Sequence, residues 1–175
     1  MKIRIKKRLN EGKGPNIIAR GLNINLLSDN AKRIFNKFGG FEEVMQGDEE
    51  TINQVIELIT GLSFKDKESL ENDLNVFKEL ARLSEIEVLK HKKNYKEMEE
   101  QFIKDYDEML KAVAAGGGPH SINPAEADDP RNNFFVIRLK NQQERAKERL
   151  LAHIKTLQDE VDKYNNITEK FQNTL

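Results

Sequence analysis

Residues 66–118 read DKESLENDLNVFKELARLSEIEVLKHKKNYKEMEEQFIKDYDEMLKAVAAGGG. No glycine or proline occurs from residue 62 to residue 115, and three consecutive glycines follow. Glycine costs a helix interior about 1 kcal/mol and proline about 3 kcal/mol, so a stretch without either favours one uninterrupted helix. Residues 131–175 form a second stretch of this kind. The sequence therefore predicts two long helices joined by a loop that is rich in glycine and proline.

Apolar residues recur at seven-residue spacing along both predicted helices. This spacing places them on one side of each helix and is typical of the seam between two coiled helices. The predicted helix seam contains Leu74, Val88, Tyr95, Phe102, Met109, Leu150, Leu157, Tyr164 and Phe171. The sequence thus favours an antiparallel hairpin in which the second helix folds back on the first.

The seam is neither continuous nor narrow. Polar residues interrupt it at Ser84, His91, Asp105 and Gln143. Further apolar residues widen the apolar face of the first helix, namely Leu80, Leu83, Ile86, Leu89, Ile103, Tyr106 and Leu110. A wide apolar face indicates more than one neighbour, as in a helix bundle or an oligomer.

Charge also favours the antiparallel arrangement. Residues 94–111 carry six acids against three lysines, and residues 138–155 carry six bases against two acids. A hairpin places these two segments opposite each other. Each exposed pair is worth only about 0–1 kcal/mol, so the charges select the register more than they stabilise it.

A small helical head is expected before the long helices. Ser28 and Asp29 are suitable N-cap residues for a first short helix, Asp48 for a second, and Gly61 is expected to end the second. The second helix has an apolar stripe at Ile52, Val55, Ile56 and Ile59. The expected partner surface for this stripe is Phe35, Phe38, Phe41, Val44 and Met45.

The N-terminal residues 1–21 are expected to form an extended basic arm. Met1, Ile3 and Ile5 alternate with basic residues, which is strand periodicity, and an isolated strand must pair with something or stay extended. The arm residues expected to bind a partner are Lys2, Arg4, Lys6, Lys7, Arg8, Ile17 and Ile18. The bases suit either an acidic protein surface, such as the acidic stretch at 41–73, or the phosphates of a nucleic acid. The apolar run at 134–137 suits either the start of a helix or a short strand able to pair with the arm.

The composition argues against several classes of function. Charged residues make up 34% of the chain. The chain has no cysteine, and this absence excludes disulfides, thiolate metal sites and a cysteine nucleophile. No motif for catalysis or for cofactor binding is present, so we expect a non-enzymatic protein without a cofactor. His91 and His153 would lie at a similar level of the hairpin, where they suit polar seam positions that fix the register better than metal ligands. No apolar segment of membrane-spanning length and no secretion signal is seen, so a cytoplasmic or virion location is expected.

The opening residues Met1-Lys2-Ile3-Arg4-Ile5-Lys6-Lys7-Arg8-Leu9-Asn10-Glu11 resemble the start of small proteins encoded by tailed bacteriophages. A charged, cysteine-free helical body is also similar to phage assembly, scaffolding and virion-associated proteins. The chain departs from the usual scaffolding pattern because its C-terminus is not strongly basic. The resemblance implies an assembly role, and it assigns no functional residue.

Together these patterns predict an all-α, elongated antiparallel helical hairpin or coiled coil with a small helical head and a basic arm. The expected segments are a basic arm at 1–21, a head at 22–61, a long helix at 62–115, a loop at 116–133 and a long helix at 134–175. The expected function is a structural or assembly protein that contacts protein partners or further copies of itself. The alternative is an accessory protein that binds nucleic acid through the arm.

Overall fold

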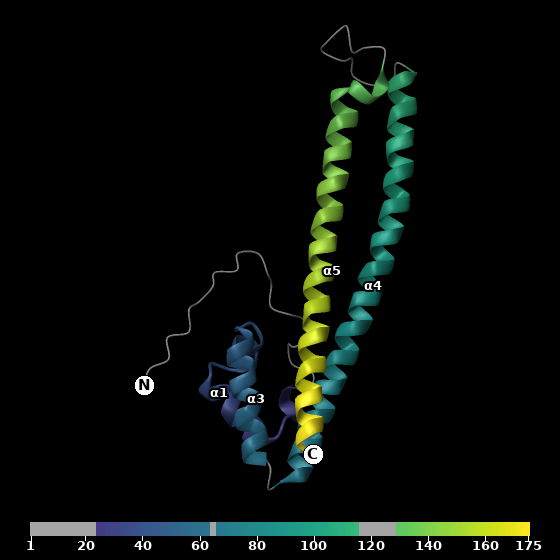
Figure 1. Ribbon diagram of the computed structural model, residues 1–175. Helices are drawn as coiled ribbons and strands as arrows, with labels where there is room; N and C mark the ends of the chain where they lie inside the picture. Colours follow the sequence, from purple (N-terminus) through teal and green to yellow (C-terminus); the bar gives the residue numbers. More distant parts are fainter. Residues whose placement is uncertain (1–23, 64–65, 116–128) are drawn as a thin grey trace. The chain divides into compact units, whose positions relative to one another are not determined.

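The computed structural model of the chain describes residues 24–63, 66–115 and 129–175 (Figure 1). Every regular element in these residues is helical, which confirms the all-α class. The predicted arm, with its basic residues and Ile17 and Ile18, lies outside the described residues, as does most of the predicted loop. The strand expected at the start of the arm therefore stays a prediction.

Two long helices form the predicted antiparallel hairpin, in which α4 (Lys67–Ala114) packs against α5 (Phe134–Thr174) (Figure 1). The Asp66 carboxylate caps α4 by accepting hydrogen bonds from the backbone N–H and the hydroxyl of Ser69, at 3.2 and 2.6 Å. Asn133 caps α5, where its side-chain oxygen accepts the backbone N–H of Phe135 at 2.9 Å. The apolar run at 134–137 is consequently helical. A short 3-10 turn, η2 (Pro130–Asn132), precedes it.

The chain divides into two compact units, and both long helices contribute to each. We call the described part of Met1–Leu83 together with Asp162–Leu175 the core unit. The hairpin unit is the described part of Ser84–Val161. The division differs from the predicted segments, because the first turns of α4 and the last turns of α5 belong with the short helices.

Four short elements begin the core unit: η1 (Ile24–Leu26), α1 (Asp29–Lys37), α2 (Phe41–Met45) and α3 (Glu49–Ser63). The Ser28 hydroxyl caps α1 as expected, and Gly39 and Gly40 end it with φ angles of 98° and 107° that favour glycine. Asp48 caps α3 by accepting the backbone N–H of Thr51 at 2.8 Å. The expectation that Gly61 ends α3 was wrong, because the helix continues to Ser63. A glycine weakens a helix by about 1 kcal/mol but ends it only where the backbone turns away.

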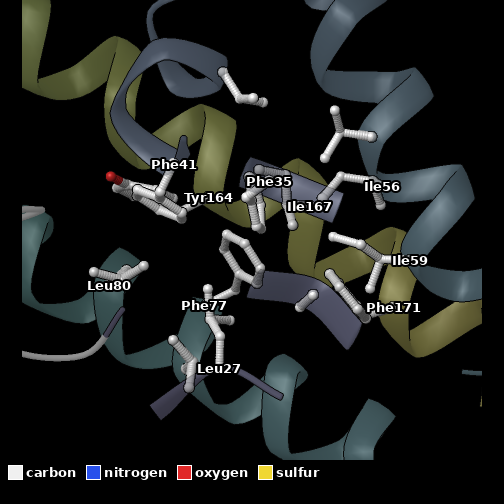
Figure 2. Close-up of a cluster of buried hydrophobic side chains, with 14 of the residues drawn as sticks. Leu27, Phe35, Phe41, Ile56, Ile59, Phe77, Leu80, Tyr164, Ile167 and Phe171 are labelled. Carbon is white, nitrogen blue, oxygen red and sulfur yellow. The ribbon is translucent and has the colours of Figure 1, made fainter. Parts of the chain in front are cut away.

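Aromatic side chains fill the centre of the core unit (Figure 2). Phe77 of α4 is fully buried, and its ring centroid lies 5.5 Å from that of Phe171, 6.1 Å from Phe41, 6.4 Å from Tyr164 and 6.5 Å from Phe35. The predicted stripe of α3 packs into the same cluster. The side chains that were expected to receive the stripe also belong to this aromatic cluster, and Phe38 is partly buried at the margin of the cluster. The ring of Phe77 on α4 thus packs against aromatic side chains from α1, α2 and α5.

The long helices also hold the short elements through polar bonds. The buried Asp73 carboxylate accepts the backbone N–H and the hydroxyl of Ser28, both at 2.6 Å. Burial raises the pKa of Asp73, while the bonds from Ser28 and the charge of Lys32 oppose the rise. The Lys163 ammonium donates to the carbonyl of Met45, the last residue of α2, at 2.9 Å. Lys170 similarly donates to the side-chain oxygen of Asn53 on α3.

Candidate protein-interaction surface

Three contacts set the register of α4 and α5 in the hairpin unit. The rings of His91 and His153 meet edge to face with centroids 4.8 Å apart. Glu99 and Lys147 form an ion pair at 3.3 Å, between the two segments whose opposite charges predicted this pairing. Further along, the Gln143 side chain donates to the carbonyl of Phe102 at 3.0 Å. Each step forward along α4 is therefore matched by a step backward along α5.

The predicted seam residues differ strongly in burial between the two units. In the core unit, Leu74, Tyr164 and Phe171 are buried in the aromatic cluster. In the hairpin unit, Val88 and Leu157 are buried in a small cluster with Val161. The remaining seam residues are only half-buried, namely Tyr95, Phe102, Met109 and Leu150. The hairpin unit thus has seam residues that two helices do not cover.

The polar seam residues have distinct environments. Ser84 is fully buried, and its hydroxyl has no hydrogen-bond partner among the described residues. His91 lies against His153 and 3.7 Å from the Glu87 carboxylate. Asp105 accepts a hydrogen bond from the side chain of Gln101 on the same helix. No group of three or more potential metal ligands is found among the described residues.

A shallow groove of about 280 Å³ opens between α4 and α5 on one face of the hairpin unit. Phe102, Ile103, Tyr106 and Asp107 of α4 and Lys140, Gln143, Glu144 and Lys147 of α5 line the groove. Ile103 is 62% exposed. It follows the seam residue Phe102 by one position, and Glu144 follows the seam residue Gln143 in the same way. The position after the seam therefore faces the groove on both helices.

Seven-residue spacing extends this face beyond the groove. On α4, Leu89 and Leu110 occupy the same helical position as Ile103, and on α5, Ile137 and Leu151 occupy that of Glu144. Leu89 is 62% exposed, Leu151 48% and Ile137 46%, while Leu110 is half-buried. We call these four residues, with Ile103 and the groove, the Ile103 face. Exposed apolar side chains thus follow one face of the hairpin unit on both helices.

The two helices that border the Ile103 face carry opposite charge. The α4 side has its acids at Glu97, Glu99, Glu100, Asp105, Asp107 and Glu108. The α5 side has its bases at Arg138, Lys140, Arg145, Lys147, Arg149 and Lys155. Against three lysines on the first side and two glutamates on the second, the balances are 3 − 6 = −3 and 6 − 2 = +4. These balances count every side of residues 94–111 and 138–155, so α4 is acidic and α5 is basic where they carry the face. The charged residues that line the groove itself are Asp107 from α4 and Lys140, Glu144 and Lys147 from α5.

Sequence reasoning identified only part of this surface. Ile103, Leu89 and Leu110 belong to the residues that were expected to widen the apolar face of the first helix. Ile137 and Leu151 were missed as part of this surface, although Leu151 follows the seam residue Leu150 by one position, as Ile103 follows Phe102, and Ile137 lies fourteen residues before Leu151. Comparing equal positions on both helices would have found them.

Comparisons with known proteins give no further assignment. No protein-family model, curated protein or solved structure matches the chain. No helix among the described residues is long and apolar enough to cross a membrane.

Proposed function

We propose that the chain is a non-enzymatic structural or assembly protein that acts through helical protein–protein contacts. The observation that carries this proposal is the Ile103 face. Burial of apolar surface is the main favourable term in protein association, at roughly 25 cal/mol per Å² removed from water. A row of exposed aliphatic side chains along two helices therefore favours a helical partner.

The proposed setting is the assembly of a particle such as a bacteriophage head or virion. The similarity of the N-terminal residues and of the charged helical body to phage proteins supports this setting. The proposed partners are further copies of the chain or other subunits of the particle, and the arm residues Lys2–Arg8 serve as a second, charged contact.

Light scattering of the full chain tests the proposal. We expect a multimer at micromolar concentration and negligible binding of duplex or single-stranded nucleic acid at about 0.15 M salt. Deleting residues 1–13 should preserve the helix content and melting temperature measured by circular dichroism, because the arm precedes the described helices. The deletion should weaken assembly with the partner or with further copies.

The second candidate function is a nucleic-acid accessory protein, which the cluster of bases at Lys2, Arg4, Lys6, Lys7 and Arg8 favours. Binding through such bases is independent of sequence and falls steeply with salt. A monomeric full chain that binds nucleic acid tightly, and loses this binding together with residues 1–13, would replace the assembly function by this one.

A further inference from the structure

We infer that the Ile103 face binds the same face of a second copy of this chain, with both hairpins pointing in the same direction, to form a four-helix bundle. The inference rests on the proposed assembly function and specifies the partner, the surface and the orientation. The two copies would be related by a two-fold axis that runs parallel to α4 and α5. Such a symmetric contact uses the same surface on both subunits.

The charge distribution selects a second copy in this orientation. With the two-fold axis parallel to the helices, the acidic α4 of one copy lies over the basic α5 of the other at the same level. The two segments with balances of −3 and +4 then meet twice, once on each side of the bundle. An axis across the helices would instead place α4 on α4 and α5 on α5, with like charges opposed.

The groove shows how one contact would form. Asp107 of α4 and Lys140 of α5 both line it, and they lie within a few residues of the same level, because Phe102 pairs with Gln143. When α4 of one copy lies over α5 of the second copy, Asp107 of each copy comes near Lys140 of the other copy. Ile103, in the same groove, would pack against its counterpart helix and lose its exposure to water.

Helix direction agrees with this orientation. Because α4 and α5 are antiparallel within one hairpin, each helix of the proposed bundle has only antiparallel nearest neighbours. This is the arrangement of up-down-up-down bundles, in which apolar seam positions from four helices share one core. The half-buried Tyr95, Phe102, Met109 and Leu150 would gain the covering that a single hairpin does not provide.

A matched pair of substitutions tests the surface. Ile103→Asp places a charge on the Ile103 face, and Leu58→Asp makes the same change at an apolar side chain that is 44% exposed and belongs to α3 of the core unit. Sedimentation equilibrium should show at least about tenfold weaker dimerisation for Ile103→Asp and less than about threefold for Leu58→Asp. Circular dichroism should show unchanged helix content for both. A chain that stays dimeric with Ile103→Asp would overturn the inference.

Cysteine cross-linking tests the orientation, since the chain has no cysteine of its own. Lys92→Cys and Lys140→Cys place single thiols on the groove side of each helix, four residues after Val88 and Val136. A short bis-maleimide should link both variants into covalent dimers. Lys104→Cys is the control and should form no covalent dimer. Lys104 is exposed and lies near the level of Lys140, but its position two residues after Phe102 places it on the opposite face.

The reversed orientation cannot link both positions. Lys92 and the level of Lys140 are about 13 residues apart along α4, which is about 20 Å. With the axis across the helices, the distance along the helices from Lys92 to its counterpart in the second copy, added to the same distance for Lys140, would be at least about 40 Å. A short linker therefore could not join both pairs. Linking of only one variant, or of neither, in a chain that is multimeric by light scattering would overturn the inference and leave the proposed function standing. A monomeric chain would overturn the inference and would favour the nucleic-acid function over the assembly function.

Discussion

The core unit and the hairpin unit share the same two helices and the same seven-residue series, yet they differ in how well that series is covered. In the core unit, Phe77 and Phe171 are fully buried because α1, α2 and α3 pack against the helix pair. In the hairpin unit, Phe102 and Tyr95 are half-buried, and α4 and α5 are the only long helices among its described residues. A seam pattern therefore sets the pairing of two helices, whereas full burial requires further elements.

The largest expected effect distinguishes two phenylalanines of α4. Phe77→Ala should lower the free energy of unfolding by about 3–5 kcal/mol, because it opens a cavity among four aromatic rings. Phe102→Ala should cost less than about half as much in the isolated monomer, and its cost should grow with protein concentration as the second copy covers the ring. Urea unfolding followed by circular dichroism at several concentrations measures both. Equal, concentration-independent losses would contradict the contrast between the units.

A smaller effect distinguishes two aspartates. Asp73→Ala should cost about 1–3 kcal/mol, because the Ser28 N–H and hydroxyl lose their acceptors at the start of α1. Asp105→Ala in the hairpin seam should change the stability by less than about 0.5 kcal/mol, since its partner Gln101 is exposed. Thermal unfolding of the two variants makes the comparison, and a costlier Asp105→Ala would contradict it.

Asp73 should also give the core unit a dependence on pH. Because burial raises its folded pKa above the ordinary value of 3.8, the folded state binds the proton more tightly than the unfolded state. This contribution to stability is fully present below pH 3.8 and is lost as the pH rises through the folded pKa. Relative to Asp73→Asn, the natural chain should therefore gain stability as the pH falls from 7 toward 4. Urea unfolding of both chains across this range checks the sign, and an opposite trend would show that the bonds from Ser28 outweigh burial.

The smallest expected effect has the opposite direction. Ser84→Ala should raise the free energy of unfolding by about 0.5–1 kcal/mol, since it removes a buried hydroxyl without a partner among the described residues and improves helix propensity. Differential scanning calorimetry would detect the higher melting temperature. A lower melting temperature would mean that the hydroxyl forms a stabilising bond.

The hairpin could be predicted from the sequence because its determinants are local. The absence of glycine and proline between Leu62 and Ala115 and the seven-residue spacing depend only on neighbouring residues. The caps at Ser28 and Asp48 were likewise visible as short motifs.

The contacts that unite the core unit could not be predicted in this way. The bond from Ser28 to Asp73 spans 45 residues, and that from Lys163 to Met45 spans 118. Neither residue pair has a sequence signature, because such bonds arise only after the helices have packed. The Ile103 face was only partly visible, since the sequence shows which positions are apolar but not which of them a second helix leaves uncovered.

The pairing of both ends of the described chain in one unit has a consequence for folding. Phe77 packs against Phe171, so we expect the core unit to complete its packing only after residue 171 has left the ribosome. The hairpin pairs residues that are closer in sequence, such as Phe102 and Gln143, so it pays less loop-closure entropy and can form first. Because α4 and α5 each continue from one unit into the other, a formed hairpin shortens the chain segment that the core unit still has to close. The less covered half of the helix pair would thus guide the closure of the better covered half.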